Sequence, residues 1–314
     1  MHWADRIVRR LRPRDLHIFL AVVEQGNMAK AANFLATSRP VVSKTIAGLE
    51  RTLGVPLLDR SPQGVEPTLY GRVLLKRSIA LFDDLRQGVQ EIKFLADPTA
   101  GELRLGCAEA IATGFVPAVI DRLSQKYPRM AFQLQVGNTV TLQIRDLRER
   151  NVELVIARML RRIPEPDMEA QILFYEQLFA VAGARNKWVG RRKIALTDLI
   201  HEPWILAPQE VESGSPVAKA FRAVGSDLPR ATVVVSSSSV RNALLATGRF
   251  ITVVPGSVLR FGIERSFLKI LPIELPPWQL PVSGIMLKNR TLSPIARLFI
   301  EYAGEVAKLL ATDR

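Results

Sequence analysis

The hydrophobic periodicity of this chain changes near residue 97, and this change restricts the possible folds more than any other feature of the sequence. Before residue 97, apolar side chains recur at helical spacing, which predicts a series of helices. The segment Asp97-Pro98-Thr99-Ala100-Gly101 lacks that pattern, and its Pro and Gly predict a break between domains. Beyond it, short apolar strands alternate with helices. We therefore predict an all-helical N-terminal domain followed by an α/β domain.

Three short helices are expected in the N-terminal domain. The first covers residues 14–25 and ends at Gly26. Asn27 is suited to cap the second helix. The third begins after Ser38, with Pro40 in its first turn, where a missing N–H group costs little. Each helix has one apolar face, so we expect the three to pack around a common core.

The outer face of the third helix carries small, polar and basic side chains, namely Pro40, Ser43, Lys44, Ala47 and Arg51. Small side chains permit close approach to DNA, and Ser, Lys and Arg donate hydrogen bonds to phosphates or base edges. On periodicity alone, an ordinary solvated helix fits equally well. The hairpin expected at 57–65, with a turn at Ser61-Pro62-Gln63-Gly64, adds a wing. We therefore predict a winged helix-turn-helix over residues 1–67.

A long helix is expected from residue 68 to about residue 96. Its apolar residues fall near heptad spacing: Leu74, Leu81, Leu85, Ile92 and Leu95. Such a stripe packs either on its own domain or on the same helix of a second copy. Its length without an interrupting Pro favours the dimer. We assign residues 68–100 to a dimerising linker helix and a hinge.

The basic charge of the chain is concentrated at the N-terminus. Residues 1–77 contain 13 basic and 6 acidic side chains, whereas the remaining 237 residues contain 30 and 24. A dense positive charge on a helical module is typical of proteins that bind nucleic acids. Double-stranded DNA is therefore the expected partner.

The segment from Leu16 to Gly71 resembles the DNA-binding head of LysR-type transcriptional regulators. The matching residues, in order and spacing, include Phe19, Ala31-Ala32, Leu35, Ser38, Pro40, Ser43, Ile46, Leu49-Glu50, Leu53-Gly54, Pro56-Leu57, Arg60 and Thr68. We expect phosphate contacts from Lys44, Arg51 and Arg60, and base or phosphate contacts from Arg39 and Ser43. Ser38 and Pro40 complete the predicted DNA-binding set. The family usually has Gln at the position of Arg39, so the resemblance does not define the operator sequence.

Residues 101–314 resemble the effector domain of the same family, which has the fold of two-lobed periplasmic binding proteins. The resemblance places the first lobe at about 101–167 and 270–314 and the second at about 168–269. The repeated strand–helix units predict mainly parallel sheets, with a ligand beyond the carboxyl ends of the strands. The resemblance also implies a homotetramer built as a dimer of dimers. It further implies a small-molecule effector and RNA polymerase as partners in transcription regulation.

Seven residues at strand ends are predicted to bind the effector: Cys107, Glu109, Asn138, Thr139, Ser236, Ser237 and Ser238. Two of the groups precede helices, whose free N–H groups attract anionic or hydroxylated ligands. Each has an alternative. The serine run also fits plain capping, and a lone cysteine also fits a buried core position. An ionised Glu109 would repel a carboxylate, so it either points outward or faces hydroxyl or positive groups. Arg158 fits either a ligand carboxylate or the surface.

The motif inventory argues against an enzyme. The sequence lacks the G-x-S-x-G, P-loop, G-x-G-x-x-G and H-E-x-x-H patterns, and its three histidines have no second metal ligand at helical spacing. We expect no catalytic residue, cofactor or metal. A hydrolase or transferase that uses the serine run would need a base, and the sequence supplies none nearby. A DNA-binding protein of constant activity, with a degenerate pocket, is the other alternative.

The composition predicts a cytoplasmic protein. A single cysteine, Cys107, excludes an intramolecular disulfide and fits a reducing compartment. The basic N-terminal residues are not followed by the apolar region of a signal peptide. No apolar run approaches the roughly 18 residues of a membrane span, so we expect no membrane association.

Overall fold

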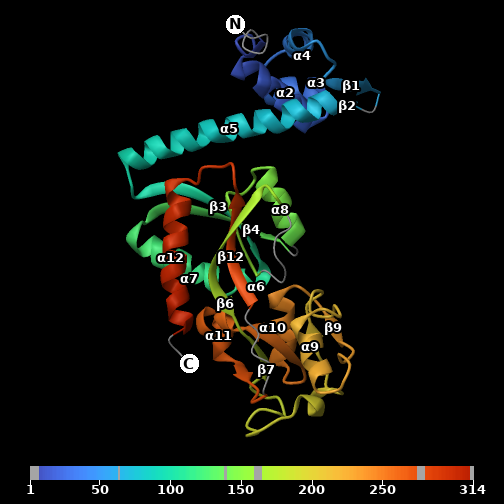
Figure 1. The fold of residues 1–314 in the computed structure, drawn as a ribbon, viewed down its shortest axis with the longest axis vertical. Helices are drawn as coiled ribbons and strands as arrows, with labels where there is room; N and C mark the ends of the chain where they lie inside the picture. Colours follow the sequence, from blue (N-terminus) through green and yellow to red (C-terminus); the bar gives the residue numbers. More distant parts are fainter. Residues whose placement is uncertain (1–6, 63, 138–139, 159–164, 274–279, 312–314) are drawn as a thin grey trace. The chain divides into compact units, whose positions relative to one another are not determined.

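The structure is a computed structural model of the 314-residue chain (Figure 1). It describes residues 7–62, 64–137, 140–158, 165–273 and 280–311. The chain forms two compact units, Met1–Gly88 and Val89–Arg314.

The N-terminal unit is helical with a small hairpin, as the periodicity predicts. Its elements are α2 (Pro13–Gln25), α3 (Met28–Phe34), α4 (Arg39–Leu53), β1 (Leu58–Ser61), β2 (Gly64–Pro67) and the first part of α5 (Leu69–Ala96). The apolar faces meet in one core, where Phe19, Val22 and Ile46 are fully buried. The Asn27 side chain caps α3 by accepting a hydrogen bond from Ala29 N at 2.7 Å. The predicted helices and their cap are therefore confirmed.

The turn between α3 and α4 contains a residue in the left-handed conformation. Ala36 has a φ of 48°. Its N–H donates to the Asn33 carbonyl oxygen and the next N–H, of Thr37, donates to Ala32. This pair of bonds forms a Schellman motif, in which glycine is the usual residue at the left-handed position. The turn that sets α4 against α3 thus contains a strained alanine.

The wing is an antiparallel pair of strands joined closely to α5. Leu58 lies opposite Pro67, and Ser61 lies opposite Gly64. Thr68 Oγ1 donates to the Pro56 carbonyl at 2.7 Å and accepts from Gly71 N at 3.0 Å. The same threonine therefore caps α5 and fixes its start beside the wing.

The first lobe of the C-terminal unit contains a five-stranded sheet, in the order β4-β3-β5-β12-β6. The strands are β3 (Ala100–Ala108), β4 (Arg129–Gly137), β5 (Leu154–Arg158), β6 (Met168–Glu176) and β12 (Leu280–Leu287). β3 runs parallel to β4 and β5, whereas β12 runs antiparallel to β5 and β6. Four of the five strands therefore run in one direction, as the prediction of mainly parallel sheets expects, and only β12, which returns from the second lobe, runs in the opposite direction. The prediction is wrong instead for the three-stranded sheet of the second lobe, where both pairs of strands are antiparallel.

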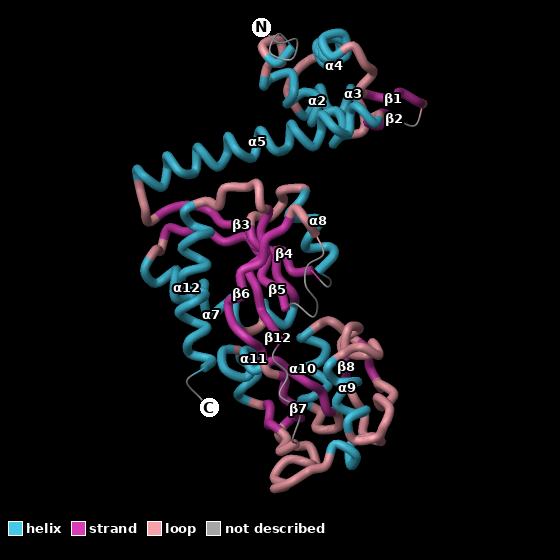
Figure 2. Tube along the Cα trace, in the orientation of Figure 1, coloured by secondary structure: helices cyan, strands magenta, loops and turns pink. Residues whose placement is uncertain are grey.

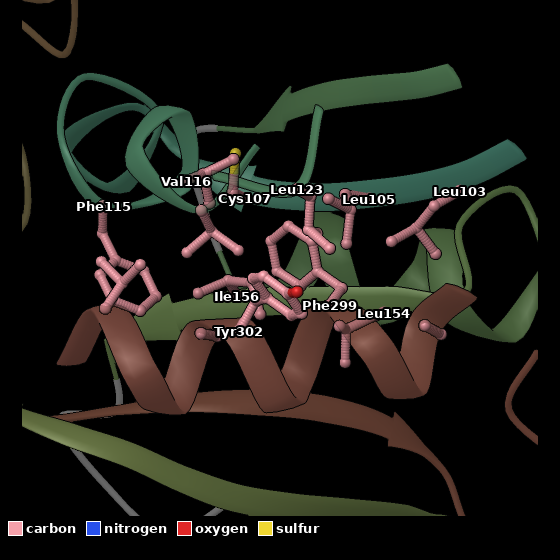
Figure 3. Close-up of a cluster of buried hydrophobic side chains, with 14 of the residues drawn as sticks. Leu103, Leu105, Cys107, Phe115, Val116, Leu123, Leu154, Ile156, Phe299 and Tyr302 are labelled. Atoms are coloured by element: carbon pink, nitrogen blue, oxygen red, sulfur yellow. The ribbon is translucent and has the colours of Figure 1, made fainter. Parts of the chain in front are cut away.

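Helices cover both faces of this sheet (Figure 2). They are α6 (Glu109–Ala112), α7 (Phe115–Lys126), α8 (Val140–Arg148) and α12 (Pro294–Ala311). In β5, Leu154 and Ile156 face α7 and α12, whereas Val155 and Ala157 face the side of α8. This alternation explains why β5 is a continuous apolar run. Figure 3 shows Phe299 of α12 among the side chains of the first of these two cores.

The second lobe contains β7 (Leu178–Gly183), paired antiparallel with β10 (Ile251–Pro255) and β11 (Leu268–Ile270), and β8 (Ile205–Leu206), parallel to β9 (Val233–Val234). Its helical segments are α9 (Pro216–Ala223), α10 (Ser238–Ala246), α11 (Gly256–Phe261), η1 (Leu196–Leu199) and η2 (Ile263–Ser266). Trp204 and Phe221 are buried here with their rings 5.7 Å apart. The Trp204 indole N–H donates to the Leu199 carbonyl at 2.8 Å, so this large polar side chain is satisfied.

The chain passes between the two sheets later than expected. We expected the second lobe to begin near residue 168, but β6 starts there and pairs with β12 in the first sheet. The passage lies at Gln177, between β6 and β7. The reason is the long antiparallel pairing from Met168 to Glu176, which keeps β6 in the first sheet.

Candidate functional site

The first candidate site is the exposed start and outer face of α4. Six of the seven predicted DNA-binding residues are exposed, and the seventh, Ser43, is half-buried. The exposed six are Ser38, Arg39, Pro40, Lys44, Arg51 and Arg60. The opposite face of α4 is buried through Val42, Ile46 and Leu49. The core therefore holds the helix by one face and leaves the polar face accessible.

Three cations on α4 are not neutralised by the protein. Within the described part of the chain, no carboxylate lies within ion-pair distance of Arg39, Lys44 or Arg51. The Ser38 side chain makes no capping hydrogen bond, although its backbone position is that of the cap. The exposed helix start provides free N–H groups, and the three cations along the outer face provide positive charge, both of which suit phosphate groups.

Glu50 connects α4 to the wing, a role that the sequence pattern did not reveal. Its Oε1 accepts hydrogen bonds from Leu57 N at 3.0 Å and Leu58 N at 3.3 Å. Its other oxygen lies 3.6 Å from the Arg60 guanidinium. Glu50 therefore positions the first wing strand and orients Arg60, whose own side chain is half exposed. The only sequence signal was the place of Glu50 in the matched motif.

The apolar stripe of α5 is divided between two surroundings. Leu74 packs against the core of the N-terminal unit. The other four residues of the predicted stripe are exposed in the single chain: Leu81, Leu85, Ile92 and Leu95. Exposed large apolar side chains in a row are typical of a surface that another chain covers.

The second candidate site lies where the two lobes of the C-terminal unit touch. Glu109 begins α6 at the end of β3, and its Oε1 accepts a hydrogen bond from the backbone N of Ser238 at 3.2 Å. Ser238 is the first residue of α10 in the second lobe and is buried. The structure therefore brings together two of the predicted effector-binding residues. It also shows that Glu109 points at the other lobe and not outward.

The serines at the start of α10 have different roles. Ser237 is the helix cap, and its Oγ accepts from Val240 N at 3.4 Å. Ser238 Oγ accepts from Arg241 Nη2 at 3.2 Å. Ser236 is half-buried before the cap. The capping alternative for the serine run is therefore confirmed at Ser237.

Ser238 is connected to a group of interacting charged side chains through Arg241, which donates to its hydroxyl. Arg158 ends β5 and interacts electrostatically with Glu176 and Glu210, and Arg241 acts on Glu210 as well. Burial raises the pKa of Glu176, and hydrogen bonds from Ser257 oppose that rise. Burial also raises the pKa of Glu210, whose carboxylate accepts from Ala207 N at 2.8 Å.

Arg158 has a hydrogen-bonding group to spare at this position. Its Nη1 is buried and has no hydrogen-bond partner among the described residues. A buried guanidinium N–H without a partner is costly and is suited to donate a hydrogen bond to a ligand oxygen. The sequence is compatible with Arg158 facing either a ligand carboxylate or the surface, and its half-buried side chain favours the interlobe role.

Cys107 lies in the core and not at the interlobe contact. It is fully buried among apolar side chains such as Leu105, Val116 and Ile156 (Figure 3). Burial raises the pKa of its thiol to about 11, and the Glu109 carboxylate adds to the rise. The thiol is therefore protonated near neutral pH and has the inert character of a small apolar side chain.

Asn138 and Thr139 lie outside the described residues, so their predicted role stays a prediction. An open groove of about 430 Å³ lies elsewhere, on α7, α11 and α12. Its lining residues are Ala118, Asp121, Arg122, Gln125, Phe261, Val306 and Leu309. None of these is a predicted effector-binding residue.

The described residues contain no group of three or more His, Cys, Asp or Glu side chains placed to hold a metal ion. None of the helices in the described ranges has the length and apolar character needed to cross a membrane.

Comparison with known proteins covers nearly the whole chain. Residues 13–72 match the profile described as "Bacterial regulatory helix-turn-helix protein, lysR family". Residues 96–308 match the "LysR substrate binding domain". The two matches follow the same order as the helical unit and the two-lobed α/β unit.

Individual relatives agree with these matches. The HTH-type transcriptional regulator TfdS of Cupriavidus pinatubonensis is 30% identical over 295 residues, covering 92% of this chain and 97% of its own. YybE of Bacillus subtilis, an HTH-type transcriptional regulator, is 27% identical over 92% of this chain and 96% of its own. The crystal structure of full-length CbnR with its target DNA is 25% identical, with a TM-score of 0.55 over 95% of this chain and 100% of CbnR.

Proposed function

Because the chain belongs to the LysR family of bacterial transcriptional regulators, we propose that it binds a twofold-symmetric promoter site as a dimer and responds to a small molecule at the interlobe contact. DNA binding resides in the winged helix-turn-helix, and the effector domain is the two-lobed unit. The single observation that carries the DNA-binding part is the exposed outer face of α4. Along it, Arg39, Lys44 and Arg51 have no carboxylate partner among the described residues.

The contacts with DNA divide into two kinds. Lys44, Arg51 and Arg60 bind phosphates, which fix the position of α4 on the duplex without reading its sequence. Arg39 and Ser43 lie at or near the helix start, where side chains reach base edges in the major groove. Arg39 in particular is able to donate two hydrogen bonds to guanine.

Dimer formation uses the exposed stripe of α5. Leu81, Leu85, Ile92 and Leu95 are apolar and exposed in the single chain, and pairing two such helices buries both stripes. Two heads held in this way bind two half-sites related by a twofold axis. Assembly of two dimers into a tetramer and contact with RNA polymerase follow from family membership.

The effector part of the proposal rests on the interlobe contact. Arg158, Glu109 and Ser238 combine charge with free hydrogen-bonding capacity at the carboxyl ends of strands, where ligands bind in α/β folds. We assign no catalytic activity to these residues, since the family consists of regulators. The protein acts in the cytoplasm, where its DNA target lies.

The test begins by selecting DNA from a random pool with the purified full-length chain. Binding to the selected site is then measured by fluorescence anisotropy at several salt concentrations. We expect a steep fall in affinity with salt, about tenfold per decade of salt for each phosphate contact, because bound counterions are released. An affinity that does not change with salt would contradict the proposal.

Two substitutions separate the two kinds of contact. Lys44→Ala should weaken binding to all sequences similarly and reduce the salt slope by about 1. Arg39→Gln should change the preferred sequence. Lys219 is an exposed lysine of the effector domain, and Lys219→Ala is the matched control. It should change neither the affinity and its salt slope nor the preferred sequence. An Arg39→Gln chain with the parent's preference would remove Arg39 from the base-reading face.

A further inference from the structure

A carboxylate of the first lobe occupies the start of a helix in the second lobe. Glu109 and Ser238 are 129 residues apart in sequence, and their hydrogen bond joins α6 to α10. Glu109 follows Cys107, the last paired residue between β3 and β5, by two positions. Arg158 follows the opposite residue, Ile156, by the same number, so both charged groups leave the sheet at one edge.

The backbone N–H groups at the start of α10 have few hydrogen-bond acceptors within their own helix. The first hydrogen bond within the helix runs from Arg241 N to the Ser237 carbonyl, which leaves three earlier N–H groups without a helical partner. The Ser237 hydroxyl accepts from one of these, that of Val240. Glu109 accepts from another, that of Ser238. The cap of α10 therefore comes partly from the other lobe.

Electrostatics favours an anion at this position. The N-terminus of an α-helix carries partial positive charge, and α10 with nine residues is long enough to develop it. The Arg241 guanidinium, on the same helix, donates to the Ser238 hydroxyl at 3.2 Å and adds a full positive charge. A hydrogen bond from an N–H group to an ionised carboxylate is roughly twice as strong as one between neutral groups.

We propose that Glu109 is a built-in carboxylate that occupies the start of α10 and holds the two lobes together, so that a ligand carboxylate binds there only by displacing it. A ligand that enters without displacing Glu109 presents a hydroxyl or ammonium group to it. This inference rests on the proposed effector response at the same contact. It adds the chemical class of the effector: a carboxylate strong enough to displace Glu109, or a hydroxyl or ammonium group that binds beside it.

The direct test uses hydrogen exchange of the full-length chain, followed by mass spectrometry of the peptide that covers residues 236–245. Glu109→Ala removes the carboxylate and should speed exchange of these amides about tenfold or more, as expected for loss of a charged hydrogen bond. Glu109→Gln retains an acceptor without the charge and should give a smaller increase. Glu102→Ala, an exposed glutamate in β3, is the matched control and should change nothing.

Chemical rescue then tests the chemical class. Sodium acetate, compared with chloride at equal ionic strength, should restore protection of the 236–245 peptide in Glu109→Ala, because acetate occupies the vacated position. It should have no effect on the parent chain. Unchanged exchange in Glu109→Ala, or equal protection of both chains by acetate, would overturn the proposal.

The two proposals fail in distinguishable ways. Binding of the selected DNA is measured on the same samples, and Glu109→Ala should retain it, because the DNA-binding residues lie in the other unit. If the affinity of the parent chain for DNA did not change with salt, the proposed function would be refuted, but the exchange result would still stand. Thermal unfolding verifies that Glu109→Ala is folded. If it is not, the Glu109→Gln chain decides: exchange no faster than in the parent would refute the proposal.

Discussion

Replacing Ala36 by glycine should stabilise the DNA-binding head, because Ala36 holds a conformation that glycine adopts without strain. Its φ of 48° is left-handed, and its side chain is exposed, so the substitution loses no buried surface. The left-handed conformation costs a residue with a Cβ atom roughly 1–2 kcal/mol. Glycine in turn gains roughly 0.4–1 kcal/mol of entropy in the unfolded chain, which opposes the effect. The net stabilisation expected for Ala36→Gly is about 0.8 kcal/mol.

Hydrogen exchange of α2 to α4 in the full-length chain measures this effect for the head alone. Protection of these amides should increase about fourfold in Ala36→Gly, the equilibrium factor that corresponds to about 0.8 kcal/mol. Ala47→Gly, within α4, provides the matched control. There the same chemical change should reduce stability by about 1 kcal/mol, because the backbone is helical. Equal loss of protection in both variants would refute the argument from the left-handed turn.

Three further predictions concern the other parts of the chain. Leu85→Asp should dissociate the dimer in analytical ultracentrifugation, whereas Asp84→Asn should not; a dimer that persists in Leu85→Asp would exclude this stripe as the interface. Phe299→Ala should lower the free energy of unfolding of the effector domain by about 3–5 kcal/mol, measured by urea denaturation, because Phe299 is fully buried. The raised pKa of Glu176 and Glu210 means that the folded domain binds protons more tightly than the unfolded chain. Their contribution to stability is therefore fully present below pH 4.5 and is lost as the pH rises through the folded pKa values. Replacing both by Gln should flatten that part of the stability profile.

The sequence by itself determined the elements whose hydrogen bonds are local. Asn27 caps α3 through N–H groups two and three residues away, and Gly26 ends α2 in the left-handed conformation. Pro40 fits the first turn of α4 because no helical partner is missed there. These contacts depend on neighbours in the sequence. The helices of the head, the wing and the approximate ends of most strands could therefore be predicted from it.

The family could also be identified from the sequence, because the characteristic residues of the helix-turn-helix lie at fixed spacing within one short segment. It did not reveal that Ala36 and Arg150 hold left-handed positions where glycine is usual. Both lie at helix ends, where the following turn imposes φ. A residue's preference is overridden there by the packing of the elements on either side.

Only the tertiary structure decided the contacts between distant segments. Strand β12 enters between β5 and β6 after the chain has passed through the second lobe, and no local pattern encodes that order or direction. Cys107 and Glu109, two positions apart, separate into the core and the interlobe contact. Glu109 meets Ser238 across 129 residues, and Arg158 lies opposite Val282 of β12, a strand far along the chain. Periodicity specifies which side of an element is buried, but the partner on that side is fixed only when sheets and helices pack.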